Sequence, residues 1–378
     1  MHVNKGTPAA MPAVLVPGCC PAATAANEVV EDVLGLVRVL GDGTVVRSAV
    51  GPVFSPATSF PENHPCVEWK EAVYDKPNNL LVRMYKPSPP AAGGKAPVLV
   101  HFHGGGFCIG SCTWANVHAF CLRLAADTGA VVLSAGYRLA PEHRLPVAVD
   151  DGAGFMRWLR GQSSSADAAD ADADAWAWLA DAADLGRVFV TGDSAGATIA
   201  HHLAVRAGVA AAGAGEAGDG ERKTPGQQVT TVRGYVLLLP FFGGVERTPS
   251  EKAGCPAGAG ALLSLDVLDR FWRVSLPVGA TRDHPVANPF GPDSPELGSV
   301  DFPPVLVVVA GLDLLRDRAV DYAERLAAAG KPVELAEFAA AAHGFYLHEP
   351  GSEATGELIR AVGRFVDSCV SASEVLLD

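Results

Sequence analysis

The sequence predicts an α/β fold, with a mostly parallel sheet of about eight strands and helices on both of its faces. Short, continuous apolar segments support this prediction, because they are typical of strands buried on both faces of a parallel sheet. Val98–Phe102, Val188–Thr191 and Val305–Ala310 are three such segments. Longer segments with helical periodicity lie between the apolar ones, so strands and helices alternate along the chain.

The N-terminal residues are expected to differ from the rest. Residues 1–27 are rich in alanine and proline, which predicts a disordered leader. Its apolar run, Met11–Ala26, contains three prolines and follows no basic cluster, so we interpret it as a leader and not as a signal peptide. Residues 28–378 are then expected to form one domain.

That domain is predicted to begin with an amphipathic helix over Glu28–Leu40, capped by Asn27. A turn at Gly41-Asp42-Gly43 and a return strand over Thr44–Ser48 follow it. Because this apolar segment precedes the first strand of the core, residues 28–66 could close over a site as a lid. Residues 240–303 contain no strong strand and are a second candidate lid.

The remaining elements follow in order. They are the antiparallel strands Val67–Tyr74 and Asn79–Tyr85, strand Val98–Phe102, helix Asn116–Asp127, strand Ala130–Ser134, helix Val147–Arg160, strand Val188–Thr191, helix Ala197–Val205, strand Val232–Leu239, helix Leu263–Val274, strand Val305–Ala310, helix Asp317–Ala329, strand Val333–Phe338 and helix Ser352–Ser368. The low-complexity segments Ser163–Asp174 and Ala210–Gln228 are expected to be exposed insertions.

Composition excludes several classes of function. A net charge of −13 argues against nucleic acid or an anionic membrane as a partner. The sequence has no apolar run long enough for a membrane span. Its eight cysteines form no C-x-x-C pair, and no nucleotide-binding glycine motif follows a strand, so we expect no metal and no cofactor. The cysteines are expected to be reduced thiols, and this favours a location in the cytosol, or also in the nucleus.

The chemistry is centred on a glycine-flanked serine, Ser194, in Gly192–Gly196. A strand precedes this G-x-S-x-G segment and a helix follows it, which is the context of a nucleophile elbow. Such a serine needs a base, and the base needs an acid that fixes its tautomer. In this architecture the three residues occur in the order serine, acid, histidine, and the acid and the histidine each lie in a loop after a strand.

The candidate acid is Asp313, which directly follows the strand Val305–Ala310. Asp317 remains the alternative, although its place at the start of a helix is explained by a favourable charge in the first turn. The candidate base is His343, in the loop after the strand Val333–Phe338. This histidine follows the serine and the acid in the sequence and lies in a loop after a strand, as the architecture requires. The alternative interpretation is that it is a structural histidine of that loop.

An acyl-transfer site also needs hydrogen-bond donors for the oxyanion. The backbone N–H of Ala195 is one candidate, because it follows the nucleophile. Gly104 and Gly105 are the others, in a glycine loop directly after a buried strand, where N–H groups can turn toward a ligand without obstruction by side chains. The alternative for this loop is an ordinary flexible connection.

Five separated motifs carry a family resemblance. They are HGGGF at 103–107, YRLAPEH at 137–143, GDSAG at 192–196, GLDLLRD at 311–317 and HGF at 343–345. Together they resemble the hormone-sensitive-lipase branch of the α/β-hydrolases, and most of all the plant carboxylesterases, to which the gibberellin receptors also belong. Three further segments, 76–87, 234–248 and 262–292, resemble the carboxylesterase subgroup that hydrolyses strigolactones.

The resemblance implies an α/β-hydrolase fold with Ser194, Asp313 and His343 as a catalytic triad. It implies Gly104, Gly105 and Ala195 as oxyanion donors. The expected function is hydrolysis of a hydrophobic carboxylic ester or lactone through an acyl-serine intermediate. The alternative is a non-catalytic hormone-binding protein like the gibberellin receptors, which keep the serine and lose the histidine; the presence of His343 favours the enzyme.

Aromatic and apolar residues near these motifs are candidates for the substrate pocket. They are Phe107, Cys108, Trp114, Phe241, Phe242, Phe271, Trp272 and Phe345. Each could equally be an ordinary core residue.

Overall fold

The computed structural model describes residues 27–48, 60–89, 94–161, 173–214, 230–254 and 263–375. The predicted leader lies almost wholly outside the described residues. So do most of the two predicted low-complexity insertions.

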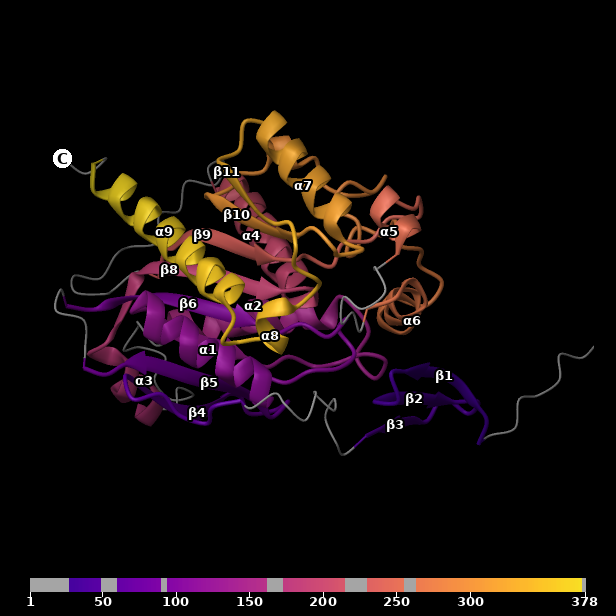
Figure 1. Ribbon diagram of the computed structural model, residues 1–378, viewed down its shortest axis with the longest axis horizontal. Coiled ribbons are helices and arrows are strands. Elements are labelled where there is room, and N and C mark those ends of the chain that lie inside the picture. The colour runs from indigo at the N-terminus through magenta and orange to yellow at the C-terminus, as the bar shows by residue number, and fades with distance from the viewer. Residues whose placement is uncertain are drawn as a thin grey trace, which may run out of the picture.

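An eight-stranded sheet forms the centre of the molecule, as predicted (Figure 1). Its strands are β4 (Val67–Asp75), β5 (Leu80–Pro87), β6 (Ala96–Phe102), β7 (Val131–Ala135), β8 (Ala183–Asp193), β9 (Val232–Leu238), β10 (Val305–Ala310) and β11 (Val333–Phe338). They lie in the order β11-β10-β9-β8-β6-β7-β5-β4. The strands from β6 onward run parallel, whereas β5 is antiparallel to both β4 and β7.

Helices cover both faces of this sheet (Figure 1). One layer contains α1 (Ala115–Thr128), α8 (Phe345–His348) and α9 (Glu353–Val375), and the other contains α2 (Val147–Gly161), α4 (Ala195–Ala214) and α7 (Arg316–Ala328). Alternate side chains of one strand enter the two layers, as a pleated strand requires. In β6, Leu99 packs with the first layer, and Val98 and Val100 pack with the second.

Several elements extend beyond their predicted bounds. The strand at Val188–Thr191 is part of the longer β8, and the helix at Ala197–Val205 is part of α4, which continues to Ala214. The start of the predicted insertion at 210–228 is therefore helical. A further helix, α3 (Ala173–Ala180), is not among the predicted elements, and its first two residues fall in the predicted insertion Ser163–Asp174.

The predicted helix over Glu28–Leu40 is wrong. The chain instead forms a three-stranded antiparallel sheet of β1 (Val29–Val33), β2 (Val37–Leu40) and β3 (Val45–Arg47). The apolar spacing suited a helix, but the residues that occupy it are mainly valines, whose β-branched side chains favour strands. A turn at Leu34-Gly35, with φ of 55° and 69°, interrupts the run and reverses the chain.

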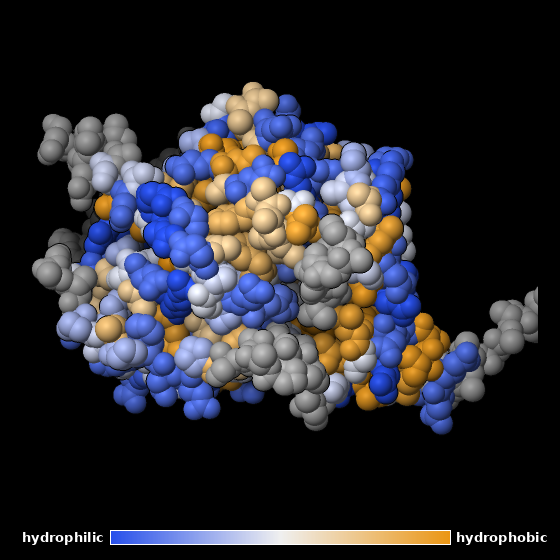
Figure 2. Space-filling view, in the orientation of Figure 1, coloured by the Kyte–Doolittle hydropathy of each residue, from blue (hydrophilic) through white to orange (hydrophobic). Residues whose placement is uncertain are grey.

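The N-terminal sheet lies beside α6 (Leu265–Ser275), at one end of the molecule (Figure 1). Arg273 of α6 forms an ion pair with Glu31, with 2.6 Å between Nε and Oε1. From β3, Arg47 donates hydrogen bonds to the carbonyl oxygens of Cys108 and Ala140. Figure 2 shows hydrophobic surface at this end of the molecule.

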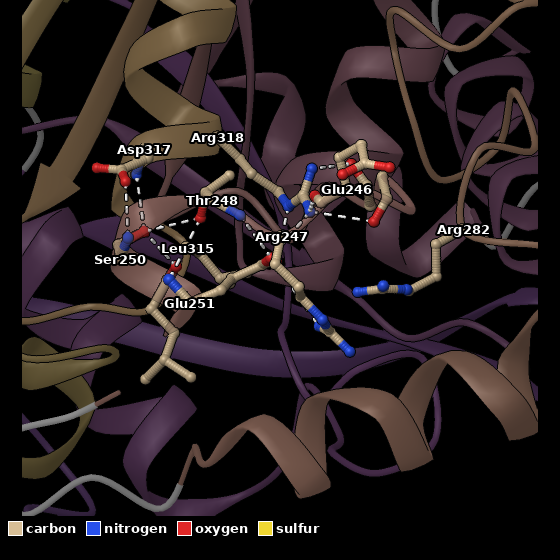
Figure 3. Close-up of polar contacts among 12 residues, drawn as sticks. Glu246, Arg247, Thr248, Ser250, Glu251, Arg282, Leu315, Asp317 and Arg318 are labelled. Atoms are coloured by element: carbon tan, nitrogen blue, oxygen red, sulfur yellow. Dashed lines mark hydrogen bonds and ion pairs between the residues drawn. The ribbon is translucent and has the colours of Figure 1, made fainter. Parts of the chain in front are cut away.

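The region 240–303 contains α5 (Pro249–Ala253), α6 and a short 3-10 helix, Leu297–Ser299. A polar network fastens α5 to α7 of the core (Figure 3). The Arg318 guanidinium donates to both carboxylate oxygens of Glu251, whose side chain is 1% exposed. Thr248 and Glu251 form a capping box that starts α5.

No helix in the described ranges is long and apolar enough to cross a membrane.

Candidate active site

Ser194 lies at the sharp turn between β8 and α4, with φ of 53°. A positive φ is strained for any residue other than glycine, so the surrounding structure must hold it. The Ser194 N–H donates to the carbonyl oxygen of Leu238, and its own carbonyl accepts from Thr198 and Phe241. These bonds fix the backbone of the turn and leave the side chain at the carboxyl edge of the sheet.

The two flanking glycines are required by close backbone contacts. A Cβ atom on Gly196 would clash with the carbonyl group of Phe102, and one on Gly192 would clash with the backbone of Gly196. These contacts explain why glycine occupies both positions. Larger residues at either position would push strand and helix apart.

Asp313 and His343 come together from the loops after β10 and β11. His343 Nδ1 lies 2.7 Å from Asp313 Oδ2. The Asp313 side chain is 1% exposed, and its other oxygen accepts a hydrogen bond from the N–H of Leu315. This arrangement fixes one tautomer of the imidazole, with the proton on Nδ1 and Nε2 free to accept.

The environment raises the pKa of His343 above its usual 6.5. Burial has the largest single effect and lowers the pKa, because it penalises the charged imidazolium. The negative charge of Asp313, its hydrogen bond and the charge of Asp193 together outweigh burial. Asp313 therefore stabilises the imidazolium form of His343.

The alternative acid, Asp317, is engaged elsewhere. Its carboxylate accepts a hydrogen bond of 2.7 Å from the N–H of Ser250, at the start of α5 (Figure 3). It thus links α7 to α5. Of the two aspartates, Asp313 is the one that contacts the histidine.

Ser194 and His343 line the same cavity. Within the described ranges no hydrogen bond joins the Ser194 hydroxyl to His343. Catalytic hydrogen bonds are often long in ligand-free structures and shorten when substrate binds, so this geometry is compatible with a serine–histidine pair.

The glycine loop lies against the turn that holds Ser194. A Cβ atom on Gly104 would clash with the Asp193 carboxylate, and Gly105, with φ of 111°, adopts a conformation that favours glycine. The backbone N–H groups of Gly104, Gly105 and Ala195 have no hydrogen-bond partner among the described residues. They are free to donate to a ligand.

Residues of the YRLAPEH segment support this loop. The Tyr137 hydroxyl donates a 2.7 Å hydrogen bond to the carbonyl oxygen of His103, and its ring stacks on the His103 imidazole. Glu142 accepts hydrogen bonds from Arg47 of β3. The contacts of Tyr137 and Glu142 are those of a structural segment.

The cavity has a volume of about 470 Å³. Besides Ser194, His343 and the glycine loop, its wall includes apolar residues from separate parts of the chain: Leu34, Leu36, Ile109, Trp114, Val117, Phe241, Leu263, Phe271 and Leu347. Leu34 and Leu36 lie in the turn between β1 and β2 of the N-terminal sheet. Leu263 lies just before α6, and Phe271 lies within it. Both candidate lids thus contribute to the wall.

Of the eight pocket residues expected from the sequence, Trp114, Phe241 and Phe271 line this cavity. The other five, Phe107, Cys108, Phe242, Trp272 and Phe345, are not among its lining residues, and this differs from the expectation. Trp272 instead stacks flat on Phe241, with 4.1 Å between ring centroids. It supports the cavity wall from behind.

The other four have partners of their own. Phe107 packs against Phe241 and Trp272, and Cys108 is fully buried. Phe242 contacts Tyr322 on α7, and Phe345 packs against Phe338 of β11. Two polar residues of the wall, Asn116 and His348, are not among the predicted pocket residues.

A family model described as the alpha/beta hydrolase fold matches residues 99–347, which is more than half of the chain. The chain belongs to the α/β-hydrolase family. The motifs of this α/β-hydrolase that carry the resemblance all lie within the matched residues.

Known relatives include both receptors and esterases. The protein is 38% identical to gibberellin receptor GID1C of Arabidopsis thaliana, over 73% of this chain and 74% of the receptor. It is 35% identical to probable carboxylesterase 6 of the same plant, over 76% of this chain and 77% of that carboxylesterase. A hyperthermophilic esterase from the archaeon Pyrobaculum calidifontis has a similar structure, with a TM-score of 0.62, 27% identity, and coverage of 82% of this chain and 87% of that one.

Proposed function

We propose that this α/β-hydrolase is a serine carboxylesterase that hydrolyses a hydrophobic carboxylic ester or lactone. The observation that carries the proposal is the contact between His343 and Asp313, in a cavity shared with Ser194. An imidazole oriented by a buried carboxylate is what a serine nucleophile requires, and a protein that only binds a ligand has no need of it.

In the proposed reaction, His343 Nε2 takes the proton of the Ser194 hydroxyl as Oγ attacks the carbonyl carbon of the ester. The N–H groups of Gly104, Gly105 and Ala195 stabilise the tetrahedral oxyanion. The intermediate collapses by breaking the ester C–O bond, and His343 returns the proton to the leaving alcohol. Water then attacks the acyl-serine by the same route and releases the acid.

The predominantly apolar wall supports a hydrophobic substrate. A strigolactone is the proposed physiological candidate, and this finer proposal rests on the resemblance of the segments 76–87, 234–248 and 262–292. Free thiols at Cys66, Cys108, Cys112, Cys121 and Cys369 are in keeping with a reducing compartment such as the cytosol.

The second candidate function is hormone binding without turnover, and the similarity to a gibberellin receptor supports it. The deciding experiment compares wild type with Ser194→Ala on a naphthyl ester and on a strigolactone, with products identified by mass spectrometry. The esterase proposal expects a loss of about 10⁴-fold or more in Ser194→Ala. The control is Ser299→Ala, an exposed serine outside the cavity. Equal turnover by wild type and Ser194→Ala would refute the proposal, and tight binding of gibberellin without any turnover would support the receptor.

A further inference from the structure

The cavity wall contains a buried polar side chain that the proposed hydrolysis does not use. Asn116 lies in the first turn of α1, lines the cavity and is 6% exposed. Its neighbours on the wall, Trp114 and Val117, are apolar. The side-chain amide is therefore an isolated polar group on an apolar stretch of the wall.

The side-chain oxygen of Asn116 is shielded from solvent and has no hydrogen-bond partner. This is unusual, because nearly all buried polar atoms in native proteins are paired. Elsewhere on the wall, His343 contacts Asp313, whereas Asp193 Oδ1 lies 3.2 Å from Nε2 of buried His101 without forming a hydrogen bond to it.

Asn116 is a lining residue of the cavity, so its amide lies within reach of a bound ligand. Rotation about the terminal torsion exchanges the positions of the amide oxygen and nitrogen, so either a donor or an acceptor can face a ligand. A hydroxyl group can pair with the amide in either orientation, because it can donate to the amide oxygen and accept from the amide NH₂. A purely hydrocarbon substrate would leave the amide unpaired and cover it further.

We propose that Asn116 binds a hydroxyl group on an otherwise hydrophobic ester, and that it makes the enzyme select hydroxylated substrates over their deoxy analogues. The inference rests on the proposed esterase function and adds a substrate class to it. Sites built to hydrogen-bond a substrate hydroxyl discriminate strongly against analogues that lack it, because the polar group of the site is then left unpaired.

The test uses methyl octanoate and its 3-, 6- and 8-hydroxy derivatives, with hydrolysis followed in a pH-stat. The derivatives place the hydroxyl at different distances from the reacting carbonyl. We expect wild type to prefer at least one hydroxylated ester by about tenfold or more in kcat/KM. The preference should appear chiefly in KM, since the contact is remote from the reacting bond and is made equally before and in the transition state.

Asn116→Leu keeps a similar size and removes the amide, so the preference should disappear. Val117→Ala is the matched control: it changes the adjacent wall residue on α1 without removing a polar group, and the preference should persist. Asn116→Gln, which keeps the amide, should retain part of the preference, and it serves as the second variant if Asn116→Leu folds poorly in a thermal melt.

The inference would be overturned if the ratio of kcat/KM for the hydroxylated ester to kcat/KM for methyl octanoate were the same in wild type and in Asn116→Leu. It would also be overturned by a wild type that prefers none of the hydroxylated esters. Failure of the esterase proposal looks different: wild type would then hydrolyse none of the four esters faster than Ser194→Ala.

Discussion

Asp313 Oδ2 and His343 Nδ1 lie 2.7 Å apart, although 30 residues separate them in the sequence. Each side chain lies in a loop at the carboxyl end of a strand, and these strands, β10 and β11, are parallel neighbours. Parallel pairing brings both loops to one edge of the sheet. The contact therefore follows directly from the topology.

This contact sets the expected dependence of activity on pH. His343 must be neutral to accept the proton of Ser194, and its pKa is raised above 6.5 by Asp313 and Asp193 against the effect of burial. As the pH falls through the raised pKa, the imidazole becomes protonated and kcat/KM should fall, with a midpoint above 6.5. Initial rates on a neutral ester between pH 5 and 9 measure this midpoint. A flat profile would exclude His343 as the base.

Exchanging the two aspartates for asparagine separates their roles. Asp313→Asn removes the charge that stabilises the imidazolium and orients the ring, so kcat should fall by about 10³–10⁴-fold. Asp317→Asn keeps an oxygen that can accept from the Ser250 N–H, so kcat should change by no more than a few fold. A comparable loss in both variants, measured by steady-state kinetics, would contradict the choice of Asp313.

The ion pair between Glu251 and Arg318 should matter for stability. Glu251 is 1% exposed and Arg318 is 11% exposed at the side chain. Glu251→Ala leaves the guanidinium of Arg318 largely buried without its carboxylate, which should cost about 3–5 kcal/mol of the free energy of unfolding in urea. Glu353→Ala is the control, because that glutamate is 89% exposed and its ion pair with Arg360 should contribute about 0–1 kcal/mol. Similar costs for the two variants would refute the structural role of the buried pair.

Leu34 combines a strained backbone with a position on the cavity wall. Its φ of 55° should cost about 1–2 kcal/mol relative to glycine. Leu34→Gly should therefore leave the free energy of unfolding almost unchanged, since relief of strain offsets the lost contacts and the added freedom of the unfolded chain. The variant loses apolar wall, and KM for a hydrophobic ester should rise by about three- to tenfold. An unchanged KM would show that Leu34 does not contact substrate.

The sheet and the predicted acid and base followed from local patterns. β10 and β11 have the predicted bounds, because an uninterrupted run such as Val305–Ala310 has few alternatives in a buried parallel sheet. Asp313 and His343 were found because loops after such strands meet at one edge. Order along the chain and strand position were sufficient to predict that Asp313 and His343 lie together.

The cavity wall could not be predicted in the same way. Phe271 and Trp272 are adjacent on α6, and residue type alone predicts that both are buried. Successive residues on a helix point about 100° apart, so only the placement of α6 decides that Phe271 lines the cavity and Trp272 supports Phe241. Asn116 carried a weak signal, as a polar residue within a run of apolar and aromatic residues.

The N-terminal sheet was missed because its valines fit two periodicities. Its position depends on residues far along the chain, since Arg47 bonds to the carbonyl groups of Cys108 and Ala140, and Glu31 pairs with Arg273. No local pattern contains that information.

Those same contacts constrain how the protein is made. β1, β2 and β3 leave the ribosome early, yet their partner helix α6 is completed only at Ser275. The N-terminal sheet must therefore wait for more than two hundred later residues before it can dock. Because Leu34 and Leu36 form part of the cavity wall, a nascent chain can assemble a closed substrate site only after α6 has been synthesised.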